Sequence, residues 1–203
     1  MASAEARLRL AAAAMRLNAA YPHLPALILM TDEARLPDPV AAASALPKRS
    51  AVIVRQTDAE GRAALAEALA PVARECGLRL LIANDAELAK RVHADGVHFS
   101  EALAREAAHW RTRHPHWLIT AAAHSAEAVM VAASSCADAA ILSPLFVTAS
   151  HPDRAGLGAE HFLAIARDAT IPVYALGGVN ADNAESLTGP NVAGIAAIDG
   201  LTA

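Results

Sequence analysis

The chain has 203 residues, which is ample for one large hydrophobic core and short for two. Hydrophobic residues make up 55% of it and aromatic residues only 3%, so alanine and aliphatic side chains must build the interior. The formal net charge is −4 and no basic stripe is present, which argues against a nucleic acid partner.

The first predicted element is an amphipathic helix over residues 3–18, in the alanine-rich stretch "MASAEARLRLAAAAMRL". Glu5 and three arginines interrupt its apolar residues too often for the core of a signal peptide. No apolar run reaches the roughly 18 residues that a membrane span needs, so no membrane partner is expected. Cys76 and Cys136 form neither a paired framework nor a metal motif, which is typical of a reducing compartment. We therefore expect a cytoplasmic protein.

Short apolar runs recur along the rest of the chain, with helical patterns between them. They lack a clean alternation of polar and apolar residues, which is typical of parallel strands buried on both faces. The predicted strands cover residues 26–30, 51–56, 78–83, 96–99, 117–123, 138–142, 171–176 and 192–198. The clearest predicted helices cover residues 59–77, 85–92, 101–113 and 125–135. Pro71 falls inside the first of these and should kink or divide it.

This order of elements predicts an α/β fold, a (β/α)8 TIM barrel that forms a single domain over residues 1–203. A doubly wound open sheet is the alternative, but no glycine-rich turn follows the first strand. Only the residues "DGLTA" follow the last strand, so the last helix must be truncated. The extra N-terminal helix would then cover the flank between the last and first strands, unless a second subunit of a homo-oligomer does so.

Working residues in such barrels lie at the carboxyl ends of the strands, where this sequence is polar. His124 ends a buried run and could act as acid or base, or could hydrogen-bond a loop carbonyl. Asp85 could be a ligand or only the N-cap of a helix. Gly177 and Gly178 would let the backbone approach a phosphate, since phosphate sites favour the last two loops.

Nearly the whole chain resembles the thiamine phosphate synthase/TenI family. The motifs that carry the resemblance are "LILMTD" (27–32), "LLIANDAELAKRVHADGVHF" (80–99), "AAAHSAEAV" (121–129), "LSPLFVTASHP" (142–152) and "IPVYALGGVNADNAESL" (171–187). The resemblance implies a transferase of thiamin biosynthesis. Such a synthase couples hydroxymethylpyrimidine diphosphate with thiazole phosphate, and Mg²⁺ holds the diphosphate.

The resemblance also assigns roles to individual residues. Asn84 and Asp85 match the pair that binds the diphosphate and Mg²⁺, and Arg55 matches a diphosphate-binding arginine. Gly177 and Gly178 match the loop that binds the thiazole phosphate. These residue types suit the binding of a diphosphate with Mg²⁺, because Mg²⁺ takes carboxylate and phosphate oxygens as ligands and arginine binds a phosphate with paired N–H donors.

The loop after the sixth strand is the last matched part of the site. Thr148 and Ser150 match its hydroxyl-bearing residues, and His151 stands where the family has a lysine. Further departures are Ile53 for a glutamine, Gln56 and Thr57 for glutamate and lysine, Leu103 for the second Mg²⁺-binding aspartate, Ala122 for a serine, and Asp199 for a phosphate-binding serine. We therefore expect weak or absent Mg²⁺ binding in a degenerate active site.

Three functions stay open at this point. The first is the synthase reaction itself. The second is that of the TenI branch, an isomerase that tautomerises a thiazole carboxylate phosphate, with a histidine at the position of His124 and no need for Mg²⁺. The third is a non-catalytic or repurposed binding protein. As a partner we expect a small-molecule phosphate or thiazole ligand.

Overall fold

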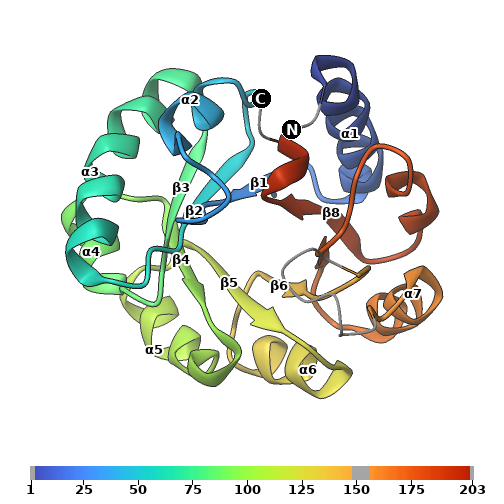
Figure 1. Ribbon diagram of the computed structural model, residues 1–203. Helices are drawn as coiled ribbons and strands as arrows, with labels where there is room; N and C mark the ends of the chain where they lie inside the picture. The colour runs from blue at the N-terminus through green and yellow to red at the C-terminus, as the bar shows by residue number, and fades with distance from the viewer. Residues whose placement is uncertain (1–2, 148–155, 202–203) are drawn as a thin grey trace.

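Eight parallel strands close into a barrel in the order β1 to β8, with β8 paired to β1 (Figure 1). The structure is a computed structural model that describes residues 3–147 and 156–201. The strands are β1 (Leu27–Met30), β2 (Ala51–Val54), β3 (Arg79–Ala83), β4 (Gly96–Phe99), β5 (Leu118–Ala123), β6 (Ala139–Leu142), β7 (Val173–Leu176) and β8 (Val192–Ala197). The predicted TIM barrel is confirmed and the open sheet is excluded.

Helices surround the barrel and account for the double burial of its strands (Figure 1). They are α1 (Ala4–Leu17), α2 (Pro39–Ser44), α3 (Ala59–Cys76), α4 (Ala86–Arg91), α5 (Glu106–Arg113), α6 (Ala126–Ser134) and α7 (Ala159–Asp168). Short 3-10 turns add η1 (Asn18–Ala20), η2 (Glu101–Leu103), η3 (Ala184–Leu187) and η4 (Asp199–Leu201). In the described part of the chain, no helix is long and apolar enough to cross a membrane.

The N-terminal helix takes the place that a full eighth helix would occupy. Helix α1 packs against β8 and β1 and against the turns η3 and η4, as predicted (Figure 1). Its inner face buries Leu10, Ala14 and Leu17. Only the three-residue η4 follows β8 within the described residues, so the expected truncation of the last helix is confirmed.

Two helical predictions differ from the structure. Helix α3 runs undivided through Pro71. Proline has no N–H, so the carbonyl of Glu67 loses its helical donor. Both residues are exposed, so water can bond to this carbonyl instead. The predicted helix 101–113 is instead the turn η2 followed by α5. Helices α2 and α7 are present in addition to the helices predicted.

Candidate active site at the barrel mouth

A pocket of about 520 Å³ opens at the carboxyl ends of the strands, where the sequence analysis expects the site. Apolar residues of the strands and polar residues that mostly follow the strands line it together. The lining residues are Met30, Thr31, Asp32, Glu33, Ala34, Arg55, Thr57, Ala83, Asn84, His98, Ser100, Ala122, His124, Ile141, Ser143 and Leu176. Arg55, Asn84 and His124 are thus brought together from β2, β3 and β5.

Arg55 is fixed in one wall of the pocket by the loop after β1. Its Nε donates to the Thr31 carbonyl at 3.0 Å, and its Nη2 lies 3.2 Å from Asp32 Oδ2. Arg35 Nη2 lies 3.3 Å from the same carboxylate oxygen. Burial works to raise the pKa of Asp32, but the hydrogen bonds and charge of Arg35 outweigh it and the pKa is lowered. Arg55 is therefore the cation that lines the pocket, although Asp32 and Glu33 balance its charge and that of Arg35.

Asn84 joins the loops that follow β3 and β4. Its backbone is left-handed, with φ 55°, and its Oδ1 accepts a hydrogen bond from the Ser100 amide at 2.7 Å. Its own amide donates to the His98 carbonyl at 2.9 Å. The carboxamide therefore shapes the pocket rim at the position matched to diphosphate binding.

His98 lines the pocket but is almost completely buried. Its Nδ1 lies 2.9 Å from the Thr120 hydroxyl. Burial, with the charge of Arg55 as a smaller cause, lowers the pKa of His98 to about 3. The imidazole is therefore neutral at physiological pH.

His124 stands exposed at the mouth, and its contacts decide which nitrogen carries the proton. Its Nδ1 lies 2.7 Å from the Ser143 carbonyl, which can only accept, so Nδ1 carries the hydrogen. The other nitrogen, Nε2, has no partner among the described residues. The His124 amide donates to Glu101 Oε2 at 2.8 Å, so the carboxylate of η2 holds the end of β5. In its neutral form the ring thus offers the Nε2 lone pair to a ligand.

Asp85 lies outside the lining of the pocket. Its Oδ1 accepts from the Leu88 amide at 2.9 Å and caps α4, while its Oδ2 lies 3.6 Å from Arg62 Nη2. Leu103, at the position of the family's second Mg²⁺ ligand, is an exposed apolar residue of η2.

The donor set does not fit a magnesium ion. The carboxylates that line the pocket are those of Asp32, held by arginines, and Glu33, which accepts from the Thr57 amide at 2.8 Å. In residues 3–147 and 156–201, no group of three or more His, Cys, Asp or Glu could hold a metal. Mg²⁺ normally takes one or two carboxylates besides phosphates and waters, and none here is free to serve.

Gly177 and Gly178 follow β7 with φ angles of 100° and 67°. A Cβ at Gly178 would lie 2.8 Å from the Phe146 Cβ, and the Gly177 carbonyl accepts from the Phe146 amide. These glycines therefore let the loop after β6 pack on the turn after β7. Thr148, Ser150 and His151 lie outside the described residues, and so does the side chain of Asp199.

The bond from His124 to a loop carbonyl was one of the two roles expected for that ring, whereas Arg62, beside the site, lay outside the sequence predictions. Because the Ser143 carbonyl is a backbone group, the sequence could not identify which residue supplies it. Arg62 lies in the first turn of α3, and this position after the β2 loop was the only signal that it could reach the mouth.

Comparison with known proteins matches the family model described as thiamine monophosphate synthase to residues 26–201. A thiamine-phosphate synthase of Chlorobium luteolum is 32% identical over 89% of this chain and 87% of its own length. A thiamine-phosphate synthase of Chloroflexus aurantiacus is 30% identical over 73% of this chain and 70% of its own length. The solved structure of thiamine phosphate pyrophosphorylase from Pyrococcus furiosus aligns with a TM-score of 0.68 and 26% identity, over 85% of this chain and 84% of that one. The chain belongs to the thiamine monophosphate synthase family.

Proposed function

We propose that this member of the family is a metal-independent isomerase that moves a proton on a small anionic heterocycle. The proposal rests on the His124 ring, whose Nδ1–H is bound by the Ser143 carbonyl so that Nε2 is the proton acceptor. The thiazole carboxylate phosphate of the TenI branch is the substrate to test. The family's coupling reaction depends on Mg²⁺, whereas the carboxylates among the described lining residues, Asp32 and Glu33, are already held by arginines or a backbone amide.

The residues divide the reaction between them. Arg55 would pair with the carboxylate of the ligand and hold it in the pocket. His124 Nε2 would then take a proton from a ring carbon, and the electron pair of that bond would move into the heterocycle. The resulting imidazolium keeps its Nδ1–H bond to the Ser143 carbonyl, which stabilises the charge. Return of the proton from Nε2 to another atom of the ligand completes the isomerisation, so neither the ligand nor the protein gains or loses a proton.

The experiment measures tautomerisation of the thiazole carboxylate phosphate by wild type and by His124→Asn. We expect kcat to fall by about 10²- to 10⁴-fold in the variant with little change in KM, since the proton acceptor is lost. His93→Asn is the matched control, because His93 is exposed in the turn before β4 and its left-handed φ of 55° suits asparagine.

The coupling reaction is assayed in parallel with hydroxymethylpyrimidine diphosphate, thiazole phosphate and Mg²⁺. Efficient coupling, or a wild type that does not turn over the thiazole, overturns the proposal. Coupling activity would restore the synthase function that the names of the relatives suggest.

A further inference from the structure

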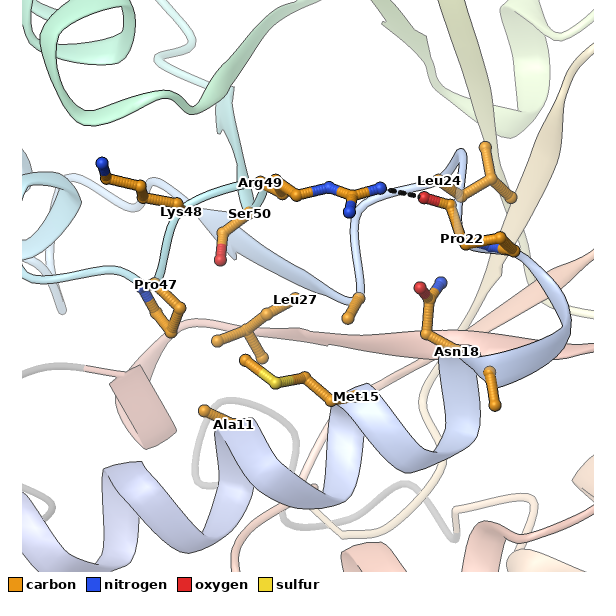
Figure 2. Close-up of a pocket in the computed structure, with 12 residues that line it drawn as sticks. Ala11, Met15, Asn18, Pro22, Leu24, Leu27, Pro47, Lys48, Arg49 and Ser50 are labelled. Atoms are coloured by element: carbon orange, nitrogen blue, oxygen red, sulfur yellow. Dashed lines mark hydrogen bonds between the residues drawn. The ribbon is translucent and has the colours of Figure 1, made fainter.

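A second cavity, of about 250 Å³, lies at the opposite end of the barrel from the mouth (Figure 2). It is open to solvent and is bounded by the C-terminal half of α1, the chain that enters β1 and the loop that enters β2. The residues around it are Ala11, Met15, Asn18, Ala19, Pro22, Leu24, Ala26, Leu27, Pro47, Lys48, Arg49 and Ser50. A dry cavity of about 150 Å³ can hold benzene, so this one has room for a small organic molecule.

Ser50 places a hydroxyl without a partner in this cavity. The residue is only 3% exposed, and in the described part of the chain its Oγ makes no hydrogen bond. Figure 2 shows that oxygen pointing into the cavity. Among the described residues Arg62 Nε is the one fully buried side-chain atom without a partner, so water reaches the Ser50 Oγ, and a ligand group that bonds to this oxygen would replace that water.

Asn18 adds a second polar group from the end of α1. It is 8% exposed, and its Nδ2 donates to the Ala193 carbonyl at 2.6 Å. That bond fixes the carboxamide, which projects toward the cavity in Figure 2 with its Oδ1 available to a ligand hydroxyl or water. The cavity therefore has a polar side chain, Asn18, whose position is fixed by a hydrogen bond of the protein.

Arg49 supplies the positive charge. Its side chain spans the cavity and its guanidinium donates to the Pro22 carbonyl (Figure 2), which uses one of several N–H groups. The neighbouring Lys48 directs its ammonium away from the cavity (Figure 2). No carboxylate is among the lining residues, so the field of Arg49 is not neutralised within the cavity. A single facing cation suits a monoanion.

The remaining surface is apolar. Met15 and Leu27 face one another beneath Arg49, and the alanines leave the space that larger side chains would fill (Figure 2). Methionine adapts its flexible thioether to different shapes. An apolar ligand body would therefore be accommodated at the end away from Arg49.

We propose that this cavity binds a small amphipathic carboxylate. The carboxylate accepts hydrogen bonds from the Arg49 guanidinium and the Ser50 hydroxyl, and its short hydrocarbon part packs on Met15 and Leu27. This site is separate from the pocket at the mouth and does not depend on the proposed isomerase activity.

The test titrates the protein, labelled at its methionine methyls, with hexanoate, hexanol and hexylamine, which share one chain length and differ in charge. Met15 and Met130 are comparably exposed, at 54% and 61%, but Met130 lies on α6, far from the cavity. We expect hexanoate to shift the Met15 methyl signal saturably, with a Kd of about 1 mM, and to leave Met130 unmoved. Hexanol should bind more weakly and hexylamine not at all.

Variants assign the contacts. Arg49→Gln should weaken hexanoate binding about tenfold and Ser50→Ala about fivefold, whereas the matched control Lys48→Gln should change it less than about twofold. Ala19→Leu, at an exposed position of the lining, should fill the space and abolish binding. Unfolding midpoints show that each variant is folded.

The proposal is overturned if none of the three compounds shifts Met15, or if Met15 and Met130 move together. It is equally overturned if hexylamine binds as well as hexanoate, or if Lys48→Gln weakens binding as much as Arg49→Gln does.

Discussion

His98 lies on β4 and His124 directly follows the neighbouring β5, yet their surroundings give the two imidazoles different chemistry. His98 is buried beside Thr120, where charging the ring would remove an ion from water without compensation. His124 is exposed, and a backbone carbonyl fixes its tautomer. The exposed ring of His124 is therefore the better placed of the two to exchange a proton with a ligand.

The buried ring predicts a pH dependence of stability. The pKa of His98 is about 3 in the folded protein, against an ordinary value of 6.5. As pH falls from about 6.5 toward 3, the unfolded chain takes up a proton that the folded chain does not, so stability is lost. Between pH 7 and pH 5 this residue alone should reduce the free energy of unfolding by about 2 kcal/mol.

Urea unfolding at both pH values measures the effect in wild type and in His98→Asn. The variant keeps an amide that can bond to Thr120 and lacks the titration, so its stability should fall by about 2 kcal/mol less than that of wild type over this pH interval. His93→Asn removes an exposed histidine and should retain the wild-type slope. Equal slopes for His98→Asn and wild type would show that His98 is charged in the folded state.

At the residue scale, Arg55, Asn84 and His124 all line one pocket, because each follows a buried strand, and their roles there stay predictions. The sequence did not settle the role of Asp85, since the residue after a parallel strand is both a ligand position and a helix N-cap. The distances from the Asp85 carboxylate to the Leu88 amide and to Arg62 favour the cap. Spacing also could not foresee that Glu101 would bind the His124 amide, which is a contact between loops.

At the element scale, the start of α4 is the part of the site that bears on the metal. Asp85 caps this helix and pairs with Arg62, whose Nε is buried without a partner in the described residues. The carboxylate therefore stabilises the protein without a cation. A free Mg²⁺ ion would have to displace a guanidinium that is tethered beside it.

This arrangement predicts that Asp85 contributes to stability and not to Mg²⁺ binding. Asp85→Ala should lower the free energy of unfolding by about 2 kcal/mol, through loss of the cap and of the partner of Arg62. Asp85→Asn keeps a capping oxygen and should lower it by about 1 kcal/mol. About 10 mM Mg²⁺ should leave the unfolding midpoint of all three proteins unchanged. A midpoint that Mg²⁺ raises in wild type but not in Asp85→Asn would assign the metal to this carboxylate.

The strands could be predicted as elements because each is buried on both faces and reads as an apolar run. The helices were less certain, since η2 and α5 share one helical pattern that breaks at the tight corner after β4. The predicted break at Pro71 did not occur for a related reason. The free energy that a proline costs inside a helix depends on whether the carbonyl without a donor meets water, and only the packing of α3 reveals this. Helix α2 is too short to show a period, with only six residues.

At the scale of the whole molecule, α1 belongs to the barrel's wall. It lies beside β8 in Figure 1, on the flank that η4 is too short to cover. Ion pairs from Arg9 to Asp182 and from Arg16 to Glu185 join its exposed side to the segment after β7. Such exposed pairs contribute little, so burial must hold the helix in place.

The last prediction tests whether α1 and the barrel unfold as one unit. Leu10 is 1% exposed on the inner face of α1, and Leu8 is 72% exposed on its outer face. Leu10→Ala should lower the free energy of unfolding by about 2–5 kcal/mol, because it leaves a cavity over β8 and η4. Leu8→Ala, the matched control, should change it by less than about 0.5 kcal/mol.

Two probes distinguish a shared transition from local detachment. Trp110 and Trp117 lie on α5 and beside β5, across the barrel from α1, so their fluorescence reports on the distant wall (Figure 1). Far-ultraviolet circular dichroism reports on all helices, α1 included. If α1 closes the barrel, Leu10→Ala moves both transitions to lower urea together. If the dichroism of this variant falls early while the tryptophan transition stays in place, α1 is an appendage and the barrel is stable without it.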